Sequence, residues 1–69
     1  MNSEEKAKLH TLLGYWIEHN QEHCEEFRDW AKKAQELGEQ QAAGELKQAI
    51  AEMEKAGTLL QQARSRLED

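Results

Sequence analysis

Residues 9–37, LHTLLGYWIEHNQEHCEEFRDWAKKAQEL, decide the fold of this chain. Core-type side chains recur along this stretch in alternating steps of four and three residues, which is the spacing of a heptad repeat on an α-helix. The repeat keeps its phase through the glycine at position 14, which costs a helix about 1 kcal/mol relative to alanine. We therefore predict one unbroken helix, roughly 50 Å long at 1.5 Å per residue.

Three rows of side chains, each with a period of seven residues, form the apolar stripe of this helix. The asparagine row contains Leu13, Asn20, Phe27 and Ala34. The tryptophan row contains Leu9, Trp16, His23, Trp30 and Leu37. The isoleucine row contains His10, Ile17, Cys24 and Ala31. We expect the asparagine and tryptophan rows to form the seam, and the isoleucine row to widen it enough for more than one neighbouring helix.

Both ends of the first helix carry recognisable signals. Asn2 and Ser3 are good N-cap residues, and an acidic pair follows in the first turn. Gly38 directly after the last periodic residue is the preferred left-handed terminator. These signals predict a helix over about residues 3–37, and the next heptad pattern predicts a second helix over about 40–68.

The second helix has its own rows. One heptad position holds Leu46, Met53, Leu60 and Leu67. Another holds Ala43, Ile50, Gly57 and Arg64. Beside them, the alanine row contains Ala42, Ala49, Ala56 and Ala63. Small side chains allow a neighbouring helix to approach closely or to insert large side chains, and we expect Trp16 and Trp30 to be inserted there as core anchors.

The short connection makes the two helices antiparallel neighbours. Residues whose numbers add to about 80 should then lie opposite one another. The expected neighbours are Trp30 with Ala49 and Ile50, Phe27 with Met53, His23 with Ala56 and Gly57, and Trp16 with Ala63 and Arg64. The fold class is thus all-α, with one hairpin domain over residues 1–69. Because a lone hairpin leaves part of each stripe in water, we expect a homodimeric four-helix bundle.

Composition limits the function classes. A chain of 69 residues buries only about 60% of its unfolded surface if it folds alone. The single cysteine excludes an internal disulfide, which leaves a metal or self-association as the stabilising device. A net charge of −5 without a basic face argues against a nucleic-acid partner. The lone thiol, the lack of a signal peptide and the lack of a long apolar run predict a cytoplasmic protein that does not bind a membrane.

The stretch Trp16–Cys24 contains the residues with the most chemistry. His19 and His23 are four residues apart and project from one helix face, close enough to bind one cation. Glu22, Glu26 and Cys24 are the candidate additional ligands. This donor set suits a transition metal, with zinc, nickel, cobalt or iron possible. The second helix or a symmetry mate would have to complete the coordination.

Each of these residues also has a structural interpretation. Asn20 in the seam can fix helix register at some cost in stability. His23 can donate to an acceptor across the bundle, with Gly57 leaving room for its ring, and His19 can pair with a nearby glutamate. Cys24 can be a small apolar filler. His10, three turns away, is a weaker ligand candidate. Two long helices offer no loop-built cleft for catalysis, so we do not expect an enzyme.

The string Trp16-Ile-Glu-His-Asn-x-Glu-His23, followed by Phe27 and Trp30 and then an alanine- and leucine-rich second helix, resembles a family of short prokaryotic helical-hairpin proteins. The resemblance covers most of the chain. It implies a helical hairpin and a metal association, and no particular reaction. Relatives often carry a further histidine where this chain has Tyr15, which argues against a three-histidine site within one helix.

Two hypotheses for the function follow. In the first, the hairpin self-associates and binds a transition metal through His19 and His23, for storage, delivery or sensing. In the second, it is a structural or partner-binding bundle that binds no metal. There, the polar seam residues set the register and the stripe receives the helix of another protein.

Overall fold

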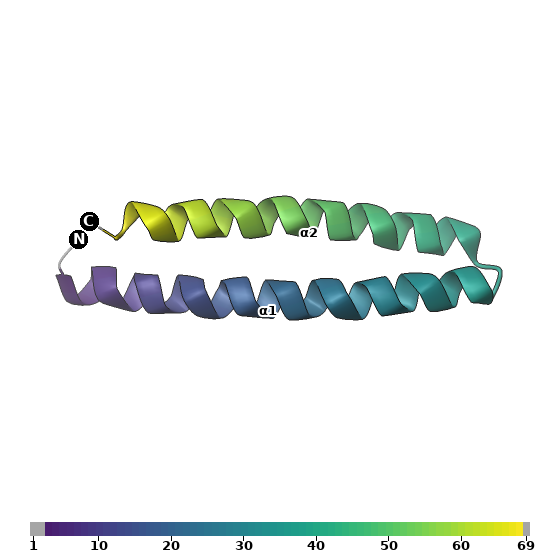
Figure 1. Cartoon of the computed structure of the whole chain (residues 1–69), viewed down its shortest axis with the longest axis horizontal. Coiled ribbons are helices and arrows are strands. Elements are labelled where there is room, and N and C mark those ends of the chain that lie inside the picture. Colours follow the sequence, from purple (N-terminus) through teal and green to yellow (C-terminus); the bar gives the residue numbers. More distant parts are fainter. Residues whose placement is uncertain (1–2, 69) are drawn as a thin grey trace.

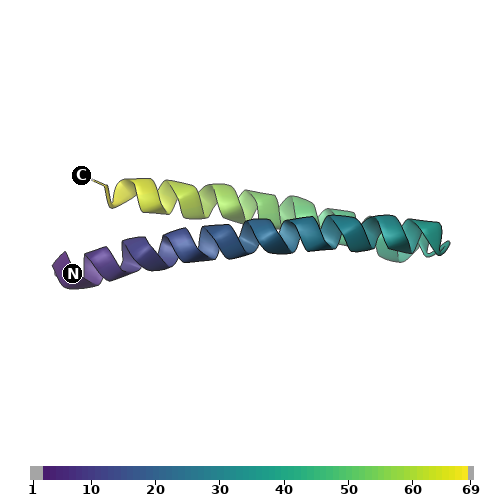
Figure 2. The ribbon, with the colours of Figure 1, turned by 60° about the horizontal axis from the view of Figure 1, so that its bottom comes forward.

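The computed structural model describes residues 3–68 and consists of two helices. Helix α1 spans Ser3–Glu36 and helix α2 spans Gln40–Arg66. The helices run antiparallel along their whole length and form a rod of 52 × 14 × 14 Å (Figure 1). A second view shows that they cross at a shallow angle (Figure 2). The predicted all-α hairpin is confirmed, with helix ends within two residues of the predicted ones; Asn2, a predicted N-cap residue, lies outside the described residues.

The turn between the helices depends on Gly38. Its φ of 82° is in the left-handed region that glycine adopts without strain. The Gly38 amide donates to the carbonyl of Gln35 (3.0 Å), and the Glu39 amide donates to the carbonyl of Ala34 (2.8 Å). These two bonds are the Schellman pattern, which satisfies the last carbonyls of α1. The predicted terminator is therefore confirmed, and it reverses the chain within three residues.

The seam between the helices differs from the predicted one by one row. On α1, the side chains that pack against α2 belong to the asparagine and isoleucine rows. The buried residues are Leu13, Ile17, Cys24 and Ala31 on α1, and Ala43 and Ile50 on α2. The tryptophan row lies beside the seam, with Trp16 45% and Trp30 61% exposed. The prediction that these tryptophans are core anchors of the hairpin is therefore wrong.

Side-chain size explains the choice of row. Both candidate seams have the same spacing of three and four residues, so periodicity cannot separate them. Closely packed helices have axes about 8–10 Å apart, which suits small residues such as Cys24, Ala31 and Ala43. Two indole rings in the same place would hold the helices apart.

Three cross-helix interactions fix the register. Arg28 forms an ion pair with Glu54, His10 lies 2.8 Å from the Glu68 carboxylate, and the Asn20 amide donates to the Met53 carbonyl. The residue numbers of both charged pairs add to values close to 80, so the predicted antiparallel register is confirmed. Within residues 3–68, neither helix is both long enough and apolar enough to cross a membrane.

Candidate functional site

The hairpin has two unlike sides. Each tryptophan-row residue within α1 stands one position before an isoleucine-row residue. Likewise, each alanine-row residue stands one position before a residue of the row that contains Ile50. In an antiparallel helix pair, such positions flank the same side of the seam. The tryptophan and alanine rows therefore form one continuous surface, which we name the apolar side. The opposite flank, which we name the polar side, carries Gln21, Arg28, Glu54 and Gln61.

The apolar side is exposed over most of its length. Beyond the two tryptophans, Leu37 is exposed and so are three of the four alanines of the alanine row. Leu12 and Tyr15 extend the exposed surface along α1. The Lys33 ammonium lies 5.3 Å from the centre of the Trp30 ring, a cation–π distance. A row of large apolar groups at a fixed seven-residue spacing is the usual form of a helix-packing surface, and within residues 3–68 no helix covers it.

The two candidate histidines belong to a series of rings along α1 that begins on its exposed face at Tyr15 and ends at the half-buried Phe27. His19 stacks on Tyr15, with ring centres 4.5 Å apart and planes inclined by 17°. The His19 and His23 ring centres are 6.1 Å apart, and His23 meets Phe27 edge-on at 6.5 Å. The rings follow one another at steps of four residues, which is the spacing of neighbours along a helix face. Both imidazoles are exposed to solvent, His23 within the tryptophan row and His19 next to it.

Of the predicted carboxylate ligands, Glu26 lies nearest to a histidine. Its Oε1 is 3.5 Å from Nδ1 of His23, and both side chains are more than half exposed. A carboxylate beside Nδ1 favours the tautomer that carries its proton there and leaves the lone pair on Nε2. Glu22 is also exposed. Thus His19, His23 and Glu26 share one exposed surface of α1.

Cys24 is the predicted ligand that the structure separates from the others. It belongs to the isoleucine row, is only 4% exposed and packs against α2. It lines a hollow on the polar side with Asn20, Arg28 and Gly57. Among residues 3–68, no three or more His, Cys, Asp or Glu side chains gather closely enough to hold a metal ion. A single hairpin therefore offers only a partial ligand set.

Asn20 and Gly57 form the most specific contact in the seam. The Asn20 amide nitrogen donates to the Met53 carbonyl at 2.8 Å. A Cβ atom on Gly57 would lie 2.8 Å from the same nitrogen, closer than carbon and nitrogen can pack. Gly57 therefore makes room for Asn20. The prediction that Gly57 would leave room for the His23 ring is wrong, because the shift of the seam by one row turns His23 outward.

His10 has a structural partner near the ends of the helices. Its Nε2 lies 2.8 Å from Oε2 of Glu68, and Arg64 approaches the same carboxylate. The hydrogen bond from His10 is the main cause that lowers the pKa of Glu68, and the charges of His10 and Arg64 act in the same direction. This pair was not predicted from the sequence, although the two residue numbers add to nearly 80 and the predicted register therefore places them almost level.

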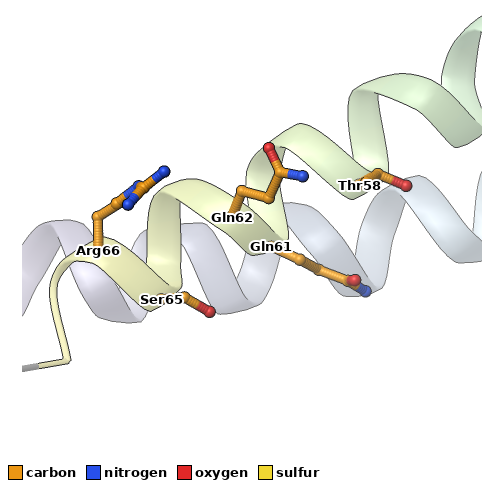
Figure 3. Close-up of a pocket in the computed structure, with 5 residues that line it drawn as sticks. All are labelled: Thr58, Gln61, Gln62, Ser65 and Arg66. Carbon is orange, nitrogen blue, oxygen red and sulfur yellow. The ribbon is translucent and has the colours of Figure 1, made fainter.

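A further hollow lies on the outer surface of α2 near its C-terminal end. Figure 3 shows its lining residues, which all come from this one helix: Thr58, Gln61, Gln62, Ser65 and Arg66. The Thr58 hydroxyl donates to the Glu54 carbonyl one turn earlier and is thus used within the helix. With no lining residue from α1, this hollow is an open stretch of helix surface.

Comparison with known proteins identifies a family for this fold. Residues 9–67 match the model of a domain of unknown function, DUF8180, and the match includes most of α1, the turn and the whole of α2. No curated protein and no solved structure matches the chain.

Proposed function

The chain belongs to the DUF8180 family, and from the two unlike sides of its hairpin we propose that it acts as an assembly module that self-associates through its apolar side. The observation that carries this proposal is the exposed tryptophan row. Trp16 and Trp30 sit on one face at heptad spacing, and large aromatic side chains in such rows are typical anchors of helix interfaces. Among the described residues, the polar side has no comparable row of exposed aromatic side chains.

The surface area of the hairpin supports the same proposal. The chain exposes 5512 Å², whereas a compact folded protein of 8.0 kDa exposes about 4,450 Å². The excess of roughly 1,000 Å² is similar to the surface that each partner buries in a standard protein interface, about 800 Å². The six residues that are buried in the described part of the chain, residues 3–68, form a small core. Covering the apolar side would complete that core.

Sedimentation equilibrium tests this proposal directly. We expect a mass of twice 8.0 kDa at micromolar concentration, corresponding to a four-helix dimer. A mass of one chain across the micromolar range would refute self-association. It would then favour the interpretation in which the helix of another protein covers the apolar side.

A second function, binding of a transition metal, is favoured by a separate observation. His19 and His23 lie on one exposed face, and Glu26 stands beside Nδ1 of His23 as carboxylates do beside many metal-bound histidines. Imidazole and carboxylate donors suit zinc, nickel, cobalt or iron. We propose that these residues contribute to such a site, with storage, delivery or sensing of the metal as its use.

The third histidine of the chain provides a matched control for this second function. The protein is loaded with zinc, nickel or cobalt, desalted and assayed for metal by elemental analysis. We expect the wild type and His10→Ala to retain metal, and the variant with both His19→Ala and His23→Ala to lose it. His10 bonds to Glu68 away from this cluster, so its removal tests for nonspecific histidine binding. Equal retention by all three proteins would refute the assignment.

A further inference from the structure

The tryptophan row has the same order of residues in both directions. Leucine, tryptophan, histidine, tryptophan and leucine follow at equal spacings of seven, with His23 at the centre. When two copies of a helix pair antiparallel about a two-fold axis, each residue lies level with the one equally far beyond the axis. An axis at His23 places Trp16 level with Trp30 of the second copy, and the terminal leucines level with each other. The row thus complements itself, which favours a second copy of this chain as its occupant.

The neighbouring row on α1 is complementary in the same arrangement. This row contains Leu12, His19, Glu26 and Lys33. Together with the tryptophan row it forms a second seam with steps of three and four residues, on the part of α1 that a third helix of a bundle would contact. An axis at His23 brings His19 within one residue, about 1.5 Å along the helix, of the level of Glu26 of the second copy. This imidazole–carboxylate match occurs twice per dimer and favours the paired arrangement.

The same pairing would gather metal ligands at the axis. In one chain, the Nδ1 atom of His23 faces Glu26, which leaves Nε2 with the lone pair that binds metals. Two copies place two His23 side chains at the same level, with His19 and Glu26 of each copy about one turn away. In the described part of a single chain, no three potential ligands lie close enough together to hold a metal ion. The pair, in contrast, has six such side chains around its axis.

We propose that two copies pair along α1, antiparallel about a two-fold axis at His23, and that they share one transition-metal site formed by His23 of both copies and completed by His19 and Glu26. This inference rests on the self-association and the metal binding proposed above, and it specifies the geometry of both. It differs from a site within one hairpin in two measurable ways: the residues that lie across the interface and the ratio of metal to protein.

Disulfide trapping tests the geometry. The native thiol is first removed by Cys24→Ala, and His23→Cys is then added as the only cysteine. Mild oxidation should link most chains of the His23→Cys protein into covalent dimers on a non-reducing gel, because residue 23 of each copy lies at the axis. Glu18→Cys in the same background is the matched control, since position 18 is exposed on the other flank of α1. It should give little covalent dimer.

Two outcomes of the trapping experiment overturn the proposed geometry. One is a protein that sediments as a dimer but whose His23→Cys variant does not cross-link. The other is cross-linking of the Glu18→Cys protein to the same extent. A protein that sediments as a monomer would instead refute the proposed self-association, so the two failures are distinguishable.

The ratio of metal to protein tests the shared site. Wild-type protein is loaded with zinc, desalted and assayed for zinc and protein. We expect one zinc ion per two chains, and the same ratio for Cys24→Ala, because Cys24 faces α2. A dimer that holds one zinc ion per chain would overturn the shared site alone, whereas a dimer that retains no zinc would also refute the metal binding proposed above.

Discussion

The apolar and polar sides of this hairpin flank the same seam, yet they are built in opposite ways. On the polar side, Arg28 and Glu54 join the two helices across the seam, and Gln21 and Gln61 line the hollow beside them. On the apolar side, Trp16 and Trp30 project beside a row of alanines and remain about half exposed. The polar side thus has the composition of an ordinary solvent-exposed surface. The apolar side has the composition of a core without the layer that would bury it.

This difference separates two sources of stability, the packing within the hairpin and the assembly of hairpins. The seam itself contains few large buried side chains. Its most specific contact is polar: the Asn20 amide, in the room that Gly57 leaves, donates to the Met53 carbonyl and sets the register. Most of the large apolar area on α1 is therefore not used within the hairpin. Substitutions on the apolar side should chiefly affect assembly, and substitutions in the seam should chiefly affect the hairpin itself.

The largest effect is expected from removing both tryptophans. In the variant with Trp16→Gln and Trp30→Gln, the dissociation constant of the dimer should rise on the order of 1,000-fold, or about 4 kcal/mol for two interface anchors. The helices should be retained, because neither ring is in the seam. Sedimentation equilibrium measures the assembly, and circular dichroism measures the helix content.

The matched control changes the polar side by the same number of residues. With Arg28→Gln and Glu54→Gln, we expect the dissociation constant to change by less than about fivefold, because an exposed ion pair contributes at most about 1 kcal/mol. Equal weakening by the two double variants would show that the two sides do not differ in function.

The second effect concerns the seam. Gly57→Ala should destabilise the hairpin by about 1–3 kcal/mol, because the new methyl group would lie 2.8 Å from the Asn20 amide. Gly44→Ala is the control with the opposite sign: a Cβ there meets no atom within 4 Å, and alanine should stabilise the helix by about 0.5–1 kcal/mol. Urea unfolding followed by circular dichroism measures both.

A third variant tests the cause of this loss. If the clash with Asn20 destabilises Gly57→Ala, then Gly57→Ala should cost clearly less in an Asn20→Ala background. An unchanged cost would mean that the glycine serves some other purpose than admitting the Asn20 side chain.

The sequence predicted the larger features because each depends on a local signal. Gly38 marks the end of α1, the short turn requires an antiparallel pair, and the heptad row with Leu46, Met53 and Leu60 faces α1 as expected. The choice between the tryptophan and isoleucine rows could not be predicted from spacing, because both continue the asparagine row with steps of three and four. That choice depends on how closely the helices approach, which is a property of the packed pair.

The candidate site was predicted only in part, because one of its features depends on local spacing and another depends on how the helices pack. The spacing of four residues placed His19 and His23 on one face, and the structure bears this out. Cys24 directly follows His23 in the sequence, which suggested a common site. Adjacent residues on a helix, however, project about 100° apart. Once the isoleucine row faces α2, Cys24 is buried and the histidines are exposed. Whether they hold a metal remains a prediction.

A smaller effect is expected from the polar-side ion pair alone. Arg28→Gln should lower the free energy of unfolding by no more than about 1 kcal/mol, since both partners are about half exposed and water screens their attraction. The effect should shrink further in 1 M salt, where the screening length is about 3 Å. Urea unfolding at low and high salt measures both. A larger loss that salt does not reduce would mean that the Arg28 side chain acts mainly by packing.

The smallest effect concerns Glu68, whose carboxylate joins the end of α2 to α1 through His10. The hydrogen bond from His10 lowers the pKa of Glu68 below its usual value, so this contact stabilises the hairpin above the unfolded-state pKa of about 4.3 and is lost as the pH falls through the folded-state pKa. His10→Ala should therefore raise the pKa of Glu68 toward its usual value, as measured by NMR titration of the side-chain carboxyl carbons. Because both side chains are exposed, global stability should scarcely change. An unaltered Glu68 titration in His10→Ala would contradict the assigned cause. The Trp16→Gln and Trp30→Gln variant should leave the titration unchanged, because those residues act on the other side of the seam.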